Sequence, residues 1–348
     1  MKLENYLDEL KRQAAETRQT RGLPVMGEAR SRLTAAFDRL LGSFPEAASD
    51  PEPRLLERKA CEGYTRELVE IGTVEGLRMR VYVLIPAKGE AEGPAPAVIA
   101  LHGHGYGARE IVGLEPDGTE RAGEPGLHKD FAVSLAREGF VAIAPELIGF
   151  GDRRLEEDIR QGPGQSSCFR LAVHLLMTGR TIAGLRVRET SAAVCYALNR
   201  PEVDPDRIGI MGISGGGLVA GFAAALDPRI RCAVVSGYAS LFEESILDRN
   251  HCLDNYVPGI LPEAEMPELL GLISPRGLFL ESGDKDRVFP REPAVKAFEQ
   301  LKRIYAEAGA PDAVRVDFFE GGHEINGGPA YAWLREQLAA PPDTTRGE

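Results

Sequence analysis

Residues 207–226 read Arg-Ile-Gly-Ile-Met-Gly-Ile-Ser-Gly-Gly-Gly-Leu-Val-Ala-Gly-Phe-Ala-Ala-Ala-Leu, and this stretch decides the fold. It opens with a short apolar run, Ile208 to Met211, which is typical of a strand buried on both faces. The pattern Gly-x-Ser-x-Gly follows, centred on Ser214, and the small residues over 215–226 predict a helix. Strand, tight turn and helix in this order are what a nucleophile elbow requires. We therefore predict that Ser214 is a nucleophile held on that turn.

The residues around Ser214 suit both the turn and the chemistry. Small neighbours leave room for a strained turn, and glycine lets the backbone approach a substrate closely. The serine would lie at the N-terminus of a helix, where unpaired amides and the helix dipole favour negative charge. The N–H of Gly215 is therefore the predicted first donor to a developing oxyanion. The pattern alone is weak, because glycine and serine are common in turns, and its place between strand and helix carries the prediction.

A serine hydroxyl needs a general base within hydrogen-bond reach. Of the six histidines, only His323 follows the last predicted strand, over 314–318, and it lies in the loop Gly-Gly-His-Glu. Taken alone, it could be an ordinary loop histidine. The order of residues along the chain favours His323 as the general base, because in hydrolases built on a nucleophile elbow the serine precedes the acid and the histidine comes last.

Two carboxylates between Ser214 and His323 compete for the role of the acid. Both lie in Ser-Gly-Asp-Lys-Asp-Arg-Val-Phe-Pro, residues 282–290, directly after a predicted strand. We predict Asp286, which precedes the apolar Val-Phe-Pro, over Asp284, which lies nearer the strand and beside a lysine. Its role would be to fix the imidazole tautomer and to stabilise the imidazolium without taking the proton.

The second oxyanion donor is predicted in the loop His-Gly-His-Gly-Tyr-Gly, residues 102–107, which follows a predicted strand. The backbone N–H of His104 is the first choice. The alternative, a metal pair formed by His102 and His104, lacks a third ligand at a recognisable spacing. We therefore expect no metal and no cofactor, and the sequence assigns no substrate-binding residue.

Apolar runs and helical segments alternate through the rest of the chain, which predicts crossover connections and a mostly parallel central sheet flanked by helices. Residues 65–86 alternate as an antiparallel hairpin does. The predicted strands are 97–101, 141–144, 208–211, 233–235, 278–280 and 314–318, and the predicted helices are 128–138, 182–199, 215–226, 293–308 and 329–338.

Two helices, over 3–20 and 28–41, precede this pattern, and a proline-rich linker over 44–54 follows them. We interpret residues 1–60 as an N-terminal helical extension and residues 61–348 as the catalytic domain. Residues 152–179 and 237–266 are long connections that could form a cap over the site. A packing appendage is the favoured role of the extension, with a role in a homo-oligomer left open.

A net charge of −12 argues against nucleic-acid partners, because such affinity comes from Lys and Arg on phosphates. Arg180, Arg186 and Arg188 are interpreted as solvated or ion-paired helix positions. The five cysteines are widely spaced without a Cys-x-x-Cys, so they predict reduced thiols and neither a disulfide framework nor a zinc site. No apolar run approaches a membrane helix and no signal peptide is recognisable, which predicts a cytoplasmic protein without membrane contact.

Over roughly Arg66 to Leu338 the sequence resembles the dienelactone-hydrolase-like and acetyl-xylan-esterase-like branch of the α/β-hydrolases. The resemblance implies the α/β-hydrolase fold and hydrolysis of a small-molecule carboxylic ester. The matching pieces are Leu-His-Gly-His-Gly (101–105), Pro-Glu-Leu-Ile-Gly-Phe-Gly-Asp (145–152), the helix 190–199, Gly-Ile-Ser-Gly-Gly (212–216), Gly-Asp-Lys-Asp (283–286) and Gly-His (322–323).

The resemblance also places site residues. Ser214, Asp286 and His323 match the triad positions of that family, and His104 and Gly215 match its oxyanion positions. One residue departs from the pattern, because dienelactone hydrolases proper carry cysteine at the elbow. A carboxylesterase or acetyl esterase is therefore the expectation. The alternatives are a peptidase or amidase of the prolyl-oligopeptidase type and a non-catalytic protein that binds ligands in the same pocket.

Overall fold

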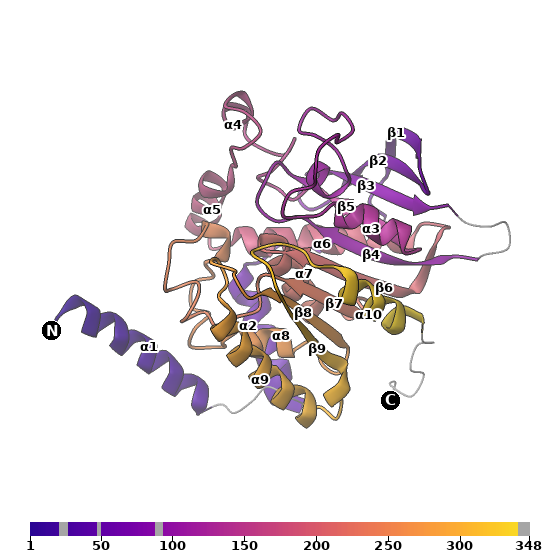
Figure 1. Ribbon diagram of the computed structural model, residues 1–348. Coiled ribbons are helices and arrows are strands. Elements are labelled where there is room, and N and C mark those ends of the chain that lie inside the picture. The colour runs from indigo at the N-terminus through magenta and orange to yellow at the C-terminus, as the bar shows by residue number, and fades with distance from the viewer. Residues whose placement is uncertain (21–26, 47–49, 88–92, 340–348) are drawn as a thin grey trace.

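The computed structural model describes residues 1–20, 27–46, 50–87 and 93–339, and within them a nine-stranded sheet forms the centre of the molecule (Figure 1). The strand order is β1-β2-β3-β5-β4-β6-β7-β8-β9. The strands β1, β2, β3 and β5 pair antiparallel, and the pairs from β5 through β4 to β9 are parallel. The bounds are β1 Arg54–Cys61, β2 Tyr64–Gly72, β3 Arg78–Pro86, β4 Ala95–Leu101, β5 Val141–Pro145, β6 Val203–Ile213, β7 Cys232–Ser236, β8 Gly277–Gly283 and β9 Val314–Phe319.

Helices cover both faces of the sheet, and each face has its own apolar cluster. The helices α3 and α10 pack on one face, whereas α6, α7, α8 and α9 pack on the other, with α2 outside α6 and α7. This confirms the predicted sheet flanked by helices. The bounds are α1 Leu3–Gln19, α2 Gly27–Leu41, α3 Phe131–Arg137, α4 Glu156–Arg160, α5 Cys168–Met177, α6 Ile182–Leu198, α7 Gly215–Leu226, α8 Met266–Gly271, α9 Arg291–Glu307, α10 Gly328–Ala339, and the 3-10 helices η1 Ala108–Ile111, η2 Leu253–Asn255 and η3 Pro311–Ala313.

The six predicted parallel strands and the hairpin over 65–86 are all present. The hairpin is covered on both faces near its end, since Val83 and Leu84 of β3 are both fully buried. The helix predicted over 128–138 begins only at Phe131, because Lys129 and Asp130 adopt positive φ angles in a turn before it. The short helix α8 was not predicted.

The N-terminal region is divided between the periphery and the core. The helix α1 lies at the edge of the molecule (Figure 1), where Arg18 donates to the Leu261 carbonyl at 2.6 Å. In contrast, α2 packs into the core, and its Phe37 ring meets Phe222 of α7 edge to face at 4.8 Å. Residues 54–60, which the sequence assigned to the helical extension, instead belong to the edge strand β1.

The two long connections differ in structure. Residues 152–179 contain α4 and α5, whereas residues 237–266 are irregular apart from η2 and the first residue of α8. Arg180, Arg186 and Arg188 each pair with a carboxylate, so the ion-paired interpretation of these arginines is confirmed. None of the described helices combines the length and the apolar character needed to cross a lipid bilayer.

Candidate active site

Ser214 lies at the sharp turn between β6 and α7, at the carboxyl edge of the sheet. Its backbone has φ 56° and ψ −123°, a left-handed conformation that serine rarely adopts. Two hydrogen bonds hold the turn: the Ser214 N–H donates to the Ser236 carbonyl, and the Leu218 N–H donates to the Ser214 carbonyl, each at 2.9 Å. The turn is therefore imposed by the surrounding sheet and helix, as a nucleophile elbow requires.

The glycines of the elbow are required by close backbone contacts. A Cβ atom on Gly212 would lie 2.2 Å from the Gly216 carbonyl oxygen, and one on Gly216 would lie 2.2 Å from the Leu101 carbonyl oxygen. A side chain at either position would force β4, β6 and α7 apart. The Gly-x-Ser-x-Gly pattern thus reflects the packing of this corner of the sheet.

His323 and Asp286 meet beside the elbow. Asp286 follows β8, and its Oδ2 accepts a hydrogen bond from His323 Nδ1 at 2.8 Å. The other oxygen, Oδ1, accepts from the backbone N–H groups of Val288 and Phe289 at 2.7 and 2.9 Å. The carboxylate is 1% exposed and fully hydrogen-bonded. His323 is therefore fixed in the tautomer that leaves Nε2 free.

The geometry distinguishes the two aspartates of this turn. Asp284 Oδ1 accepts from the Gly321 N–H at 3.1 Å in an exposed position, so it braces the histidine loop through the backbone. Asp286 is the carboxylate that contacts the imidazole of His323. Gly237, which has φ 53°, lies against the same ring, and a Cβ atom there would lie 3.0 Å from its Nδ1 and Cε1 atoms. The glycine therefore leaves room for the imidazole.

Ser214, His104 and His323 line one cavity of about 280 Å³. No hydrogen bond joins the Ser214 hydroxyl to His323 among the described residues. In unliganded enzymes such bonds are often long and tighten only when substrate binds. The remaining lining residues are Leu127, Asn250, His251, Cys252, Asn255, Val288 and Phe289.

Two residues of the second predicted cap segment, His251 and Asn255, line this cavity. Tyr256 does not line it, nor do Phe169 and His174 of the first connection, and Phe169 is largely exposed on α5. Burial lowers the pKa of His251, and its buried Nε2 has no hydrogen-bond partner in the described part of the chain. His251 therefore presents a neutral polar group beside the cavity.

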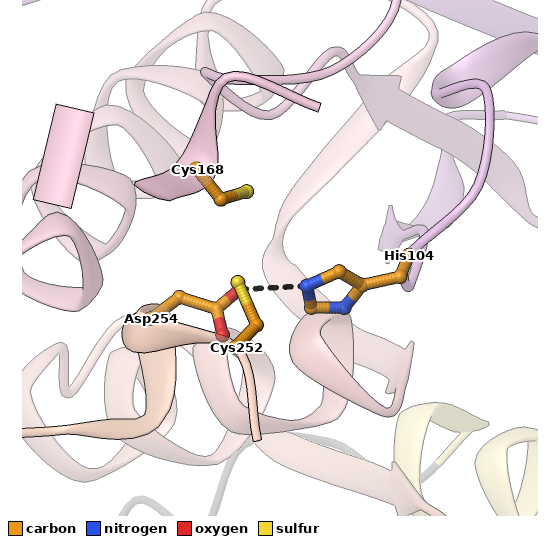
Figure 2. A group of neighbouring side chains, drawn as sticks. All are labelled: His104, Cys168, Cys252 and Asp254. Carbon is orange, nitrogen blue, oxygen red and sulfur yellow. Dashed lines mark ion pairs between the residues drawn. The ribbon is translucent and has the colours of Figure 1, made fainter. Parts of the chain in front are cut away.

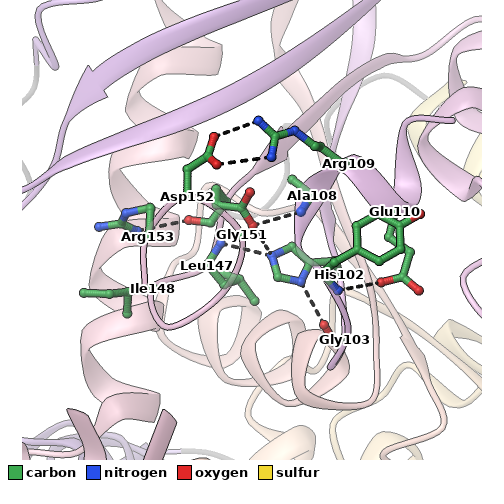
Figure 3. Close-up of polar contacts among 12 residues, drawn as sticks. His102, Gly103, Ala108, Arg109, Glu110, Leu147, Ile148, Gly151, Asp152 and Arg153 are labelled. Atoms are coloured by element: carbon green, nitrogen blue, oxygen red, sulfur yellow. Dashed lines mark hydrogen bonds and ion pairs between the residues drawn. The ribbon is translucent and has the colours of Figure 1, made fainter. Parts of the chain in front are cut away.

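The loop that carries His104 is anchored by two buried histidines, of which Figure 3 shows His102. His102 donates through Nδ1 to the Gly103 carbonyl at 2.8 Å, and its Nε2 accepts from the Leu147 N–H at 3.1 Å. His128 Nε2 accepts from the Gly103 N–H at 2.9 Å, and burial lowers the pKa of His128. Both nitrogens of His102 are occupied, so His102 positions the loop and does not act as a metal ligand with His104.

A second link joins this loop to the segment after β5. Glu146, which is buried, accepts from the Ala108 N–H at 2.9 Å. Arg109 donates to both oxygens of Asp152 at 3.1 and 2.9 Å (Figure 3).

The ring of Phe150 meets the imidazole of His104 edge to face at 5.1 Å. These contacts place His104 over the start of α7, where a Cβ atom on Gly215 would lie 3.2 Å from its ring.

The side chain of His104 belongs to a cluster that the sequence did not reveal (Figure 2). The cluster comprises His104, Cys168 of α5, and Cys252 and Asp254 of the second connection, and the candidate ligand atoms of these residues all lie within 4.8 Å of one another. The sequence showed no third metal ligand at a recognisable spacing from His102 and His104, whereas the fold places three candidate ligand side chains beside His104. The partners come from distant segments without any fixed spacing, so only the fold brings them together.

A buried cation lies behind this cluster. Arg186 of α6 donates to Asp254 Oδ2 at 2.6 Å and to the Cys168 sulfur at 3.0 Å, and both Arg186 and Asp254 are 1% exposed. The Cys252 thiol hydrogen-bonds to Cys168, and this bond together with Arg186 lowers the pKa of Cys168. Burial opposes charge on His104, but Asp254 and Cys168 together outweigh burial and raise the His104 pKa.

A further buried carboxyl group lies beneath the elbow. Glu281 of β8 accepts from the Ser236 hydroxyl and, at 2.7 Å, from the Gly327 N–H. Within the described residues no cation pairs with it, and burial raises the pKa of Glu281 to about 7. Since the Ser236 carbonyl holds the Ser214 N–H, Glu281 supports the elbow from behind.

Comparisons with known proteins show the family of the chain. The model of the dienelactone hydrolase family matches residues 79–252. The chain is also 32% identical over 295 residues to the protein named "Putative hydrolase YtaP" from Bacillus subtilis (strain 168), a match that spans 82% of this chain and 91% of that protein.

Solved structures show the same fold at low sequence identity. A glucuronoyl esterase from Solibacter usitatus superposes with a TM-score of 0.67 at 17% identity, covering 90% of this chain and 93% of that chain. Acetyl xylan esterase 1 from Thermoanaerobacterium sp. superposes with a TM-score of 0.57 at 19% identity, covering 93% and 98%. The predicted α/β-hydrolase fold is thereby confirmed.

Proposed function

The chain belongs to the dienelactone hydrolase family, and from this premise we propose that it is a serine hydrolase that cleaves small carboxylic esters through an acyl-enzyme intermediate. One observation carries the proposal. His323, which Asp286 holds through a hydrogen bond of 2.8 Å, lines the same cavity as Ser214, and Ser214 lies on a strained turn at a helix N-terminus. This arrangement supports a triad in which Ser214 is the nucleophile, His323 the general base and Asp286 the orienting acid.

In the proposed mechanism, the Ser214 hydroxyl attacks the ester carbonyl while His323 Nε2 takes its proton. The tetrahedral intermediate collapses, the C–O bond to the alcohol breaks, and the alcohol leaves with the proton from His323. Water then attacks the acyl-enzyme with His323 again as base, which releases the acid and restores the serine. Asp286 stabilises the imidazolium throughout and does not take the proton itself.

The negative oxygen of the intermediate would be held by the backbone N–H groups of Gly215 and His104. Gly215 is the first residue of α7, so its N–H has no acceptor within the helix. Among the described residues, no acceptor is hydrogen-bonded to the His104 N–H. Each such donor typically contributes about 3 kcal/mol to transition-state stabilisation.

The size and lining of the cavity favour a small acyl group. Its volume is about 280 Å³, at the lower limit of ordinary ligand pockets. Leu127, Val288 and Phe289 supply an apolar side, whereas Asn250 and His251 supply polar groups. An acetyl ester of a polar alcohol fits both sides, and two of the superposable structures are named as acetyl xylan esterases.

Replacing Ser214 tests the proposal directly. We expect S214A to lose at least about 10⁴-fold in kcat on p-nitrophenyl acetate, because the nucleophile is absent, and to lose labelling by a fluorophosphonate probe. S191A, on α6 and far from the cavity, is the matched control and should retain both. Full turnover by folded S214A, or an unlabelled wild-type protein, would overturn the proposal.

Substrate preference requires a second measurement. We expect turnover of p-nitrophenyl acetate to exceed that of an aminoacyl p-nitroanilide and to fall as the acyl chain lengthens. Faster cleavage of the anilide would indicate a peptidase or amidase. A panel of acetylated sugars would then identify the alcohol.

A further inference from the structure

We propose that His104, Cys168, Cys252 and Asp254 bind one thiophilic divalent cation, with zinc the best-matched ion. The four side chains converge from three segments: the loop after β4, the start of α5, and η2 with the residue before it (Figure 2). All four candidate ligand atoms lie within 4.8 Å of one another. The proposal concerns binding and does not depend on ester hydrolysis.

The donor set matches the preference of zinc. Two sulfurs, one imidazole nitrogen and one carboxylate oxygen are ligand types that zinc takes in tetrahedral sites. Ligands at about 2.0–2.3 Å from zinc lie roughly 3.3–3.8 Å from one another in a tetrahedron. The cluster, with a largest separation of 4.8 Å, needs to contract by roughly 1 Å at most, which side-chain rotation can supply.

Charge balance supports occupation of this buried position. Two thiolates and one carboxylate carry three negative charges, and a dication together with the Arg186 guanidinium carries three positive charges. Arg186 already donates to Asp254 Oδ2 at 2.6 Å and to Cys168 at 3.0 Å. A bound dication therefore leaves no net charge in the interior, where an uncompensated charge is costly.

An unsatisfied polar atom points into the site. His104 Nε2 is buried, and among the described residues it has no hydrogen-bond partner, although Asp254 Oδ2 lies 3.3 Å away. Such atoms are rare in folded proteins and call for an unseen partner. A cation between His104 and Asp254 supplies that partner.

The groups around the cluster resemble the outer contacts that orient metal ligands. Asn255 Nδ2 donates to Asp254 Oδ1 at 2.7 Å, and Arg186 fixes Oδ2. The T-shaped contact with Phe150 orients the His104 ring. Partners of this kind fix ligand direction and strengthen binding.

A disulfide between Cys168 and Cys252 is the competing chemistry, and the structure favours the cation. Both cysteines are free thiols here. A disulfide would use only the two sulfurs and would leave His104 Nε2 without a partner, whereas a cation uses all four groups. Once bound, the cation would tie α5 and the loop before η2 to the loop of the proposed oxyanion donor.

Cobalt titration of the intact protein tests the proposal without an activity readout. The full chain is purified, reduced with a thiol-free phosphine, stripped with a chelator and titrated with Co²⁺. We expect saturation at one equivalent, with thiolate-to-cobalt charge-transfer absorption and intense tetrahedral d–d bands, both abolished by one equivalent of Zn²⁺. Absence of one-to-one binding by the reduced protein, or binding without thiolate absorption, would overturn the proposal.

Serine variants locate the site. C168S and C252S should each bind Co²⁺ more than about 100-fold more weakly and lose part of the charge-transfer band, whereas C61S, on β1, should bind as the wild type does. Circular dichroism of each variant checks that it is folded. If a variant does not fold, the cobalt titration of the wild-type protein alone tests the proposal. Undiminished binding by both variants would contradict the assignment. So would a Cys168–Cys252 disulfide in the untreated protein combined with no binding after reduction.

Discussion

Two histidine–aspartate pairs flank Ser214, and they are built in opposite ways. His323 contacts Asp286 through Nδ1, whereas His104 contacts Asp254 through Nε2. The first pair therefore leaves Nε2 for the cavity, and the second buries Nε2 within a cluster of cysteines. Only the first has the orientation that a general base requires.

The two carboxylates are also stabilised differently. Backbone N–H groups hold Asp286, and its one ion-pair partner among the described residues is His323. Burial alone would raise the pKa of Asp254, but His104 and Arg186 together hold it below its usual range. A histidine–aspartate contact near a serine is therefore not enough to identify a catalytic pair. The aspartate must also lack a permanent counter-ion, because only then can its charge assist proton transfer.

The largest effect should come from neutralising the acid of the first pair. We expect D286N to lower kcat on p-nitrophenyl acetate by about 10⁴-fold, because the amide favours the wrong tautomer of His323. The free energy of unfolding of D286N should change little compared with this loss of activity. Steady-state kinetics measures the loss, and a variant within tenfold of wild type would remove Asp286 from the proposed triad.

Neutralising the acid of the second pair should act on stability instead. D254N leaves the Arg186 guanidinium buried without its counter-ion, which should lower the free energy of unfolding by about 3–5 kcal/mol. Urea denaturation measures this, and kcat per folded molecule should stay within about tenfold of wild type. D152N, which removes a partly exposed partner of Arg109, is the control and should lose less than about 1 kcal/mol. Equal losses in the two variants would refute the assigned difference.

Glu281 is a third buried carboxyl group near Ser214, and it differs from both aspartates. Among the described residues it has neither an imidazole nor a cation as partner. Its pKa rises from 4.5 to about 7 on folding, so the folded state keeps a proton that the unfolded state loses between these values. The stabilisation is complete below about pH 4.5 and is lost as the pH rises to about 7, on the order of 3 kcal/mol in all.

E281Q should abolish this pH dependence, since glutamine stays neutral and can still bond to Ser236 and Gly327. Relative to the wild type, the free energy of unfolding of E281Q should therefore rise between pH 4.5 and 7. Denaturant titrations at several pH values measure the difference. A difference that is constant across this range would show that Glu281 does not titrate there.

The smallest effect should come from the aspartate two residues before the proposed acid. D284N should keep kcat within about threefold of wild type, because the exposed Asp284 side chain contacts the backbone N–H of Gly321 and not the imidazole of His323. The same kinetic assay as for D286N measures it. A loss comparable to that of D286N would mean that the loop, and not one carboxylate, sets the activity.

The sequence predicts the strands, the flanking helices and the elbow because each has a local signature. Buried runs, a glycine pattern with tight contacts and the order of serine, acid and histidine are all readable along the chain, and the structure brings Asp286 and His323 into contact. Their catalytic roles remain predictions. The edge strand β1 was missed because its residues are mostly exposed and charged, without the alternation that marks a half-buried strand.

The second pair could not be predicted, because its members have no pattern of spacing. His104, Cys168, Cys252 and Asp254 come from three loops and helix starts, and only the packing of α5 and α6 against the second connection makes them neighbours. One signal was available: an arginine in the largely apolar helix over 182–198. Arg186 required a buried counter-ion, and that counter-ion is Asp254.

The φ angle of 56° at Ser214 creates a trade-off between stability and activity at this position. Holding a serine in this conformation costs about 1–3 kcal/mol, whereas glycine adopts it freely and gives back only about 0.5–1 kcal/mol in chain entropy. An inactive S214G protein should therefore melt at a higher temperature than the active one. Screens that select for thermal resistance alone would then enrich for loss of the nucleophile, so directed evolution of this scaffold needs turnover as a joint criterion.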